Sequence, residues 1–240
     1  MGRLQCPCVE FLKTIKMENT IVIAFFYLIG ISILLIFNEL NYRRLKVSGE
    51  ITRKFAHFTA TLATIPFPYI FTSHWYVLIL AFIFLVTLFA TQHGRQLRSI
   101  HGIERKSAGS YLLPAAIYLT FLISNFLENK FLYILPMLIL AVCDPMAAIL
   151  GMNTKKNNGK IKLFGIKTGK TVIGSTAFLI TSFIISIIAL YFHRLAFDLK
   201  TFWLALAVAI VGTLAEMVSW RGSDNLSIPL SVVLILILFL

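Results

Sequence analysis

Apolar stretches of roughly membrane-spanning length recur along the whole chain, and this pattern restricts the fold more than any other feature. Hydrophobic residues make up 58% of the 240 residues and charged residues only 13%, about half the charged fraction of a soluble domain. Because the hydrocarbon core of a bilayer is about 30 Å thick, one spanning helix needs about 20 apolar residues. The sequence therefore predicts an all-α, polytopic bundle of membrane helices.

Eight stretches are candidate spans, and we expect seven or eight transmembrane helices. The approximate spans are 20–38, 56–71, 75–91, 109–125, 131–149, 173–192, 202–219 and 226–240. Pro66 and Pro68 interrupt the second stretch, and the last one has only 15 residues. The count therefore depends on how these two stretches fold.

The segments between these stretches are short and polar, which indicates one domain. We expect a transmembrane catalytic domain over 20–240, an N-terminal extension over 1–19, and a long polar loop over 152–171. Met17 is an alternative start to Met1. The loop is rich in Lys and Asn, which is typical of a flexible, solvated segment, and its position between two spans makes it a candidate lid over a nucleotide.

Lys and Arg residues are unevenly divided between the two sides of the expected bundle. Sixteen of the 22 fall in the connecting segments 39–55, 92–108, 150–172 and 220–225. The positive-inside rule places these segments in the cytoplasm and both termini on the other side. We therefore expect a multi-pass protein of a cell inner membrane, or of the endoplasmic reticulum or a plastid in a eukaryote, with its active face in the cytoplasm.

The formal net charge of +12 has two interpretations. The basic residues contact anionic lipid headgroups, or they form a basin for a polyanion such as a nucleotide. Nucleic acid is not an expected partner, because most aromatic residues lie in the spans and no nucleic-acid-binding motif is present. The sequence does not fix the oligomeric state.

The first polar signature lies where the second span begins, on the predicted cytoplasmic side. It reads Arg53-Lys54-x-x-His57, and at helical spacing Arg53 or Lys54 shares a face with His57. Charged residues next to hydrocarbon are costly and usually functional. Neighbouring cations oppose a metal ion, so these three residues are candidate phosphate contacts.

The second signature is Asp144, near the cytoplasmic end of the 131–149 span and just before Pro145. A carboxylate there is unfavourable unless it binds a metal ion, accepts a proton or pairs with a cation. Ala147, Ala148 and Gly151 follow, and such small residues would let a ligand approach closely. We therefore favour a catalytic or Mg²⁺-binding role for Asp144 over a structural pair with a lysine.

The third signature is a Lys-rich segment that leads into the sixth span. The segment 165–171 resembles a P-loop, but three residues separate its glycines where the motif needs four. Gly174 and Ser175 lie at the start of the span, with Lys167 and Lys170 just upstream. Free N–H groups at a helix N-terminus beside lysines suit phosphate; alternatively, the lysines only set the topology.

The fourth signature combines acids and an amide at the cytoplasmic end of the seventh span. Glu216 lies within the span, and Asp224 and Asn225 follow it. Carboxylate and amide oxygens suit Mg²⁺. Together with Asp144, these residues are the predicted metal ligands.

In their order along the chain, the signatures resemble the polyprenol kinase family, which includes dolichol kinase and phytol kinase. A CTP-dependent diacylglycerol kinase is a relative of that family. The likeness covers about residues 50–230 and rests on Arg53-Lys54-x-x-His57, Asp144-x-x-Ala147-Ala148-x-x-Gly151, Lys170-Thr171-x-x-Gly174-Ser175, Glu216 and Asp224-Asn225-Leu226-Ser227-Ile228-Pro229. The family often has an acidic residue just before the Gly-Ser pair, where this chain has Ile173. That departure keeps an inactive membrane scaffold open as an alternative.

The resemblance implies transfer of the γ-phosphoryl group of CTP, or of another nucleoside triphosphate, to a lipid alcohol with the help of Mg²⁺. The acceptor would be an isoprenoid alcohol of the phytol, dolichol or polyprenol type, or diacylglycerol. Asp144 and Asp224 are then the expected catalytic residues. The expected metal ligands are Asp144, Glu216, Asp224 and Asn225, and the expected nucleotide contacts are Arg53, Lys54, His57, Lys167, Lys170, Gly174 and Ser175.

Two further functions remain open at the level of the sequence. A membrane cytidylyltransferase that makes CDP-diacylglycerol would use the same CTP, Mg²⁺ and a lipid, although the long acid-rich C-terminal signature of such enzymes is missing. A transporter would place its polar groups near the middle of the membrane, whereas these signatures lie at one face.

Overall fold

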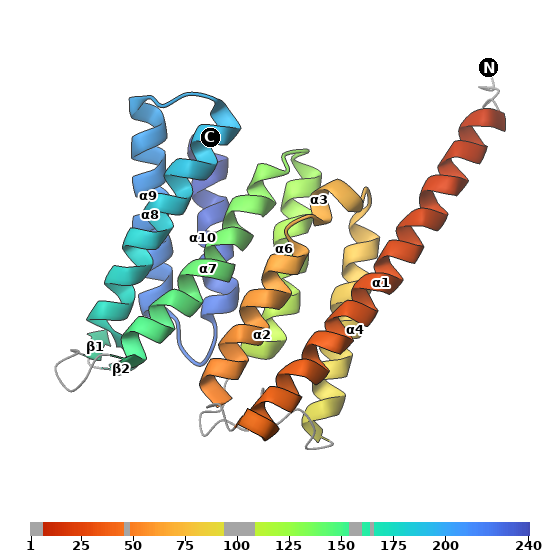
Figure 1. Cartoon of the computed structure of the whole chain (residues 1–240). Helices are drawn as coiled ribbons and strands as arrows, with labels where there is room; N and C mark the ends of the chain where they lie inside the picture. The colour runs from red at the N-terminus through yellow and green to blue at the C-terminus, as the bar shows by residue number, and fades with distance from the viewer. Residues whose placement is uncertain (1–6, 46–48, 94–108, 154–159, 164–165) are drawn as a thin grey trace.

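The computed structural model describes residues 7–45, 49–93, 109–153, 160–163 and 166–240. These residues form a helical bundle with one small β-hairpin, which confirms the predicted all-α, polytopic class (Figure 1). The elements are α1 (Pro7–Leu45), α2 (Gly49–Thr64), α3 (Phe67–Ile70), α4 (His74–His93), α6 (Gly109–Phe126), α7 (Phe131–Asn153), β1 (Lys160–Leu163), β2 (Ile166–Thr171), α8 (Val172–Arg194), α9 (Leu199–Val218) and α10 (Asp224–Phe239).

Within the described residues, six helices are long and apolar enough to cross a membrane: α1, α4, α6, α7, α8 and α9. The expected spans 56–71 and 226–240 correspond to shorter helices. α2 and α10 have 16 residues each, so each is about 24 Å long, less than the hydrocarbon thickness of about 30 Å. α2 ends at Thr64, and Pro66 begins the separate short helix α3.

The first helix is longer than its apolar stretch. α1 runs without interruption from Pro7 to Leu45, and its apolar part is Asn19–Arg44. The expected boundary between an extension over 1–19 and the first span therefore marks a change in composition and not the start of the helix.

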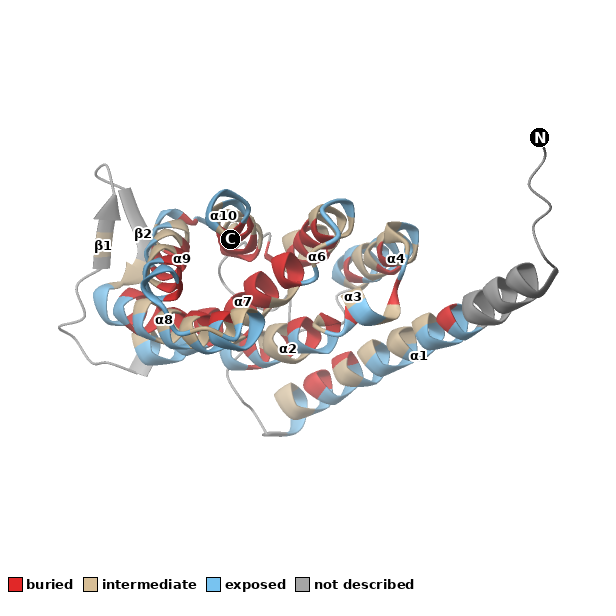
Figure 2. Ribbon diagram, turned by 90° about the horizontal axis from the view of Figure 1, so that it is seen from above, coloured by how far each residue is buried: buried red, intermediate tan, exposed pale blue. Residues whose placement is uncertain are grey.

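α7 is the central helix of the bundle and packs against α2, α6, α8 and α10. Tyr133, Leu140 and Cys143 on this helix have no exposed surface, and the buried residues gather on α7 and on the faces turned toward it (Figure 2). The outer faces carry exposed apolar side chains such as Phe25 and Ile33, each 61% exposed. Large apolar patches of this kind are expected where a protein contacts lipid.

The turn between α8 and α9 is fixed by its end residues. Leu195 ends α8 in the left-handed conformation, with φ of 51°, and the side chain of Asp198 caps α9 by accepting from the Thr201 N–H at 2.8 Å. Arg194 donates to both carboxylate oxygens of Asp198, at 2.7 and 2.9 Å. These hydrogen bonds from Arg194 and Thr201 hold the pKa of Asp198 well below its usual range.

The two ends of the bundle differ in what they carry. The hairpin, the end of α1 and the starts of α2, α8 and α10 lie at one end, whereas α1 begins and α10 finishes at the other (Figure 1). Aromatic side chains with a cation over the ring occur at both ends: Lys130 lies 4.3 Å from the Tyr69 ring centre, and Arg221 lies 4.2 Å from that of Trp220. Aromatic and basic residues commonly mark the two membrane–water interfaces.

The segment after α7 differs from our expectation of a flexible loop over 152–171. β1 and β2 are antiparallel strands in which Lys160 pairs with Thr171 and Leu163 with Ile166. The flexible-loop prediction is therefore wrong for the residues of the two strands, while 154–159 and 164–165 lie outside the described residues. β2 leads directly into α8, so the hairpin connects to the start of a membrane helix.

The two ends of the bundle are expected on opposite sides of the membrane, so two exposed positions, one at each end, should be accessible from opposite sides. In a chain with Cys6 and Cys8 replaced by Ser and the buried Cys143 kept, Lys130→Cys should react with a membrane-impermeant maleimide on intact cells. Arg221→Cys should react only after permeabilisation, because it lies at the hairpin end, which the positive-inside rule places in the cytoplasm. Labelling of both positions from the same side would contradict a membrane-spanning bundle.

Candidate functional site

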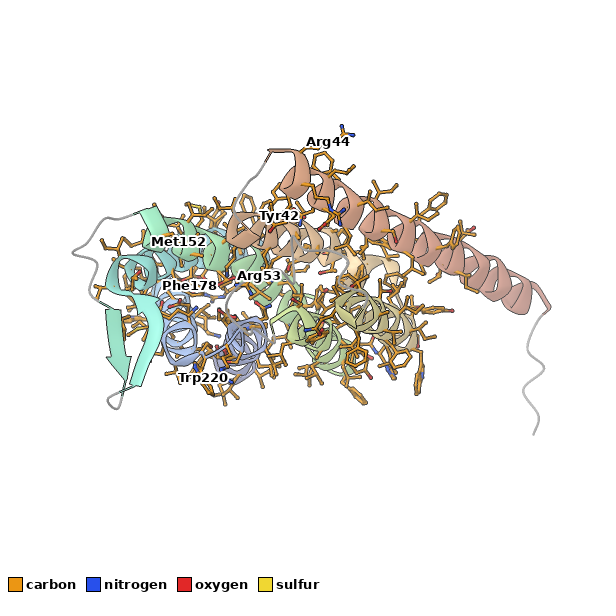
Figure 3. All side chains as sticks on the ribbon, turned by 90° about the horizontal axis from the view of Figure 1, so that it is seen from below. Tyr42, Arg44, Arg53, Met152, Phe178 and Trp220 are labelled. Atoms are coloured by element: carbon orange, nitrogen blue, oxygen red, sulfur yellow. The ribbon has the colours of Figure 1, made fainter. Side chains whose placement is uncertain are left out.

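Charged side chains from distant parts of the sequence meet inside the bundle at the hairpin end. They come from α2, α7, β2, α9 and α10, and seen from this end Arg53 lies near the middle of the helices while Arg44 lies at the outer edge (Figure 3). The carboxylates of this buried charge cluster are Asp144, Glu216 and Asp224, which are 1%, 3% and 9% exposed. A buried charge is strongly destabilising unless it is paired, and each of these three acids has a lysine partner.

Lys54 and Asp144 form the first pair. The Nζ atom of Lys54 lies 2.5 Å from Oδ2 of Asp144, and the two residues are 90 positions apart in the sequence. His57, one helical turn after Lys54, approaches the same oxygen with its Nε2 at 3.8 Å. The predicted shared face of Lys54 and His57 is confirmed, and the pair with a lysine, which we considered less favourable for Asp144, is present.

Lys170 forms the second part of the cluster by bridging two acids. Its Nζ lies 2.8 Å from Oε1 of Glu216 and 2.9 Å from Oδ2 of Asp224. Burial opposes the charged form of Lys170, but the nearby carboxylates of Asp224, Asp144 and Glu216 outweigh that effect and raise its pKa above the ordinary value. Lys170 is therefore a fixed positive charge at neutral pH.

The start of α8 connects to the same group of residues. Thr171 caps the helix, and its Oγ1 accepts from the Gly174 N–H at 3.2 Å. Ser175, 5% exposed, donates to Oε2 of Glu216 at 2.8 Å. The sequence-predicted helix start at Gly174 and Ser175 is thus present, but both groups are hydrogen-bonded within the protein, and their contact with phosphate stays a prediction.

The start of α10 is held by two further bonds. Asp224 is the first residue of the helix, where the helix dipole favours a negative charge, and it accepts from the Asn225 N–H at 3.0 Å. The Asn225 side-chain amide donates to the Gly109 carbonyl at 2.7 Å. This bond uses the amide nitrogen of Asn225 and not its oxygen, and it ties α10 to the start of α6.

The small residues after Asp144 have a different role from the one we expected. A Cβ atom on Gly174 would lie 2.8 Å from the Ala147 carbonyl oxygen, and one on Gly151 would lie 2.7 Å from Oγ1 of Thr171. Ala147, Gly151 and Gly174 therefore let α7 and α8 pack closely. The group that approaches Ala147 and Gly151 is the start of α8 with its cap residue Thr171. This close contact brings the Asp144 helix to the start of α8.

A cavity opens beside the cluster, between α1, α2, α4, α6 and α10. Its polar part is lined by Arg53, Lys54, His57, Ser110, Asp224 and Asn225. Apolar side chains line the remainder, with Ile31, Leu34 and Leu35 from α1, Ala56 and Ala60 from α2, Phe84 and Leu88 from α4 and Leu113 from α6. The Nε2 atom of His57 is buried and has no hydrogen-bond partner among the described residues, so the polar part offers a group that a ligand can satisfy. The cavity suits a molecule that is polar at one end and apolar at the other.

The structure thus brings together most of the predicted site. Only the backbone of Lys167 is described, in β2 opposite Lys162, so the predicted phosphate contact of its side chain lies outside the described residues. Among the described residues, no three His, Cys, Asp or Glu side chains lie close enough together to hold a metal ion. Glu216 and Asp224, which share Lys170, fit the mode in which Mg²⁺ uses one or two carboxylates together with substrate phosphates, and a closed all-protein metal site does not fit.

Three features of the site were not found from the sequence. Thr171, Gly109 and the α1 wall of the cavity were not candidates, because caps, backbone acceptors and apolar walls have no distinctive residue type. For Thr171 a signal exists, since a Thr three residues before Gly174 at a helix start is a typical N-cap. The contribution of α1 depends on tertiary packing alone.

The Lys54–Asp144 pair predicts a non-additive effect on stability. Lys54→Met or Asp144→Leu alone leaves a buried unpaired charge and should lower the free energy of unfolding by about 3–5 kcal/mol. The double replacement removes both charges and should lower it by much less than the two single effects combined. Thermal unfolding of the purified variants in detergent measures this, with the exposed Lys130→Met as control; strictly additive losses would contradict the pair.

No family model, no curated protein and no solved structure matches this chain. The resemblance to the polyprenol kinase family therefore stays a prediction from the signatures. What the structure adds is that these signatures, far apart in the sequence, lie in one cluster beside one cavity.

Proposed function

We propose that the protein is a membrane lipid kinase that transfers the γ-phosphoryl group of CTP or another nucleoside triphosphate to the hydroxyl of a lipid alcohol. The observation that carries this proposal is the position of the buried charge cluster at the polar end of an otherwise apolar cavity. A lipid alcohol has the same division, with one hydroxyl on a long apolar tail. Isoprenoid alcohols and diacylglycerol both belong to this class.

The charges support phosphoryl transfer because this reaction depends mainly on positioning and on neutralising phosphate charge. Ion pairs hold Lys170 and Lys54 in the cluster, and Arg53 lines the cavity next to them. We assign these three residues to the phosphates of the nucleotide. The N-terminal end of α8, with its positive helix dipole, lies beside Lys170 and adds to the attraction.

In the proposed step, the hydroxyl oxygen of the lipid forms a bond to the γ-phosphorus while the bond from that phosphorus to the β-bridging oxygen breaks. The products are the lipid phosphate, the nucleoside diphosphate and one proton. Asp144 is our candidate to orient the hydroxyl and take up its proton, because its carboxylate is buried within 3.8 Å of His57, which lines the cavity. Asp224 lines the cavity itself.

Mg²⁺ bound with the nucleotide would neutralise phosphate charge. Glu216 and Asp224, with the amide oxygen of Asn225, are the residues we propose to hold it. Lys170 lies between the two carboxylates, so these acids also set the position of the cation that contacts phosphate. Asp144 is separated from them by its own pair with Lys54, which favours its role toward the hydroxyl over a role as metal ligand.

Ile173, where the family often has an acid, lies outside the buried cluster. Its side chain is 40% exposed on the first turn of α8, whereas Ser175 two residues later is 5% exposed. The absence of an acid at position 173 therefore leaves the three buried carboxylates of the cluster in place. This position of Ile173 favours an active kinase over an inactive scaffold.

Asp144→Asn should lower the turnover of lipid alcohol about 100-fold or more, because the amide cannot accept the proton. The assay is the transfer of label from γ-labelled CTP or ATP to a panel of lipid alcohols by purified protein, with activity normalised to the folded fraction. Asp198→Asn at the opposite end of the bundle is the matched control and should keep normal turnover. Near-normal activity of Asp144→Asn would rule out its assigned role.

Analysis of the nucleotide product separates the kinase from the alternative cytidylyltransferase. A kinase releases CDP and leaves a lipid monophosphate, whereas a cytidylyltransferase releases pyrophosphate and leaves a CDP-lipid. Release of pyrophosphate would replace the proposed function by the alternative.

A further inference from the structure

A groove runs between α1 and α2 and joins the cavity at the charge cluster. Gly30 and Tyr27 of α1 and Ala63 of α2 line the groove. Ile31, Leu34 and Ala60 line both the groove and the cavity. The groove therefore adjoins the cavity that carries the polar residues Arg53, His57 and Asp224.

The groove exists because small residues face each other where two tilted helices diverge. α1 runs at an angle to the other helices and diverges from them toward its N-terminal end (Figure 1). Within the part of the chain that the structure describes, a Cβ atom on Gly30 would meet no atom within 4 Å, and Ala60 and Ala63 present only a methyl group from α2. No side chain of the described residues fills the space at this point.

The lining of the groove selects an apolar occupant. Thr59 contributes a hydroxyl, but its Oγ1 donates to the Phe55 and Ala56 carbonyls at 2.8 and 3.2 Å. The other lining residues are apolar apart from Tyr27, whose ring packs edge-on against Phe67 with 5.1 Å between the ring centres. Hydrocarbon is therefore favoured along this wall.

The position and length of the groove fit a lipid tail. The lining residues of α1 extend from Ile23 to Leu35, about 18 Å along the helix axis, which is more than half the hydrocarbon thickness of about 30 Å. Phe26, which lines the groove, and its neighbour Phe25 are 65% and 61% exposed, as expected for side chains that contact the bilayer. A lipid can thus enter sideways from the membrane and still reach the charges with its polar end.

We infer that the groove between α1 and α2 binds the hydrocarbon tail of the lipid alcohol and is its entry route from the bilayer, with the hydroxyl placed near His57 and Asp224. α1 lies before the stretch of about 50–230 that carries the family resemblance, so this site is a feature of the present structure. The chemical nature of the head group depends on the proposed function, but the place of the tail does not.

The test fills the groove from either wall. Gly30→Phe and Ala63→Phe each place a ring in the open space, whereas Ile33→Phe adds the same ring to the 61%-exposed outer face of α1. Each protein is reconstituted in phospholipid nanodiscs with a long-chain alcohol that carries a photoreactive diazirine in its tail, without nucleotide. In the parent and in Ile33→Phe, the label should map to peptides within 23–35 and 56–63.

Both groove variants should lose this labelling by about tenfold or more, which corresponds to about 1.4 kcal/mol of binding free energy. In the kinase assay they should raise the KM for geranylgeraniol by a larger factor than the KM for geraniol, because the tail of geraniol is half as long and has less contact with the groove. Size-exclusion profiles identify a variant that fails to fold, and the other variant then decides the result.

The outcomes separate the groove from the proposed function. If the parent phosphorylates no alcohol but its tail labelling is lost in the groove variants, the groove is supported and the kinase function is overturned. If the parent phosphorylates long alcohols, and both variants keep its labelling and its KM, the groove proposal is overturned. Crosslinks between two copies through α1, in place of lipid labelling, show that self-association covers this surface and also overturn it.

Discussion

The charge cluster at the hairpin end is the constraint on which the rest of the structure depends. Three carboxylates and Lys54 are buried, and Lys170 is partly buried, where α2, α7, β2, α9 and α10 meet. A buried charge is strongly destabilising without its partner. The pairs therefore fix the relative positions of five elements that the apolar packing of a membrane bundle would otherwise leave free to slide. The same pairs give the site its arrangement of acids and cations.

The scaffold around the cluster serves to bring these elements close together. α7 is buried in the centre and carries Asp144 near its end, and the glycines at 151 and 174 let α8 approach it until the cap of α8 touches it. The hairpin leads Lys170 to the start of α8, where it meets Glu216 and Asp224. α1 stands apart from this core, and its separation creates the groove that leads from the bilayer to the cluster.

Much of this could be predicted from the sequence because a membrane limits the choices. The lengths of the apolar stretches predicted the helical class, and the positions of the charged signatures predicted residues that the structure brings together at one end. The pairing of Lys54 with Asp144 could not be predicted, since the two residues are 90 positions apart and either could have had another partner. The groove was beyond prediction because it depends on the tilt of α1.

The hairpin shows a different kind of failure. Lys160-Ile161-Lys162-Leu163 alternates polar and apolar residues, and Gly165 follows two positions later, which is a recognisable signal for a strand followed by a turn. The high content of Lys and Asn nearby led to the prediction of a flexible loop instead. The Lys and Asn content reflects only the average polarity of the segment, whereas the alternation of polar and apolar residues over 160–163 indicates a strand.

The central claim is that the charge cluster binds the phosphates of a nucleotide, and the most direct measurement is the thermal unfolding midpoint of the purified protein with and without CTP and Mg²⁺. A ligand that binds only the folded state raises this midpoint. The account predicts that saturating nucleotide raises the midpoint of the parent, and that Lys170→Gln shows no rise above its own nucleotide-free midpoint. The absence of a rise in the parent for CTP and ATP alike, or an equal rise in Lys170→Gln, would contradict it.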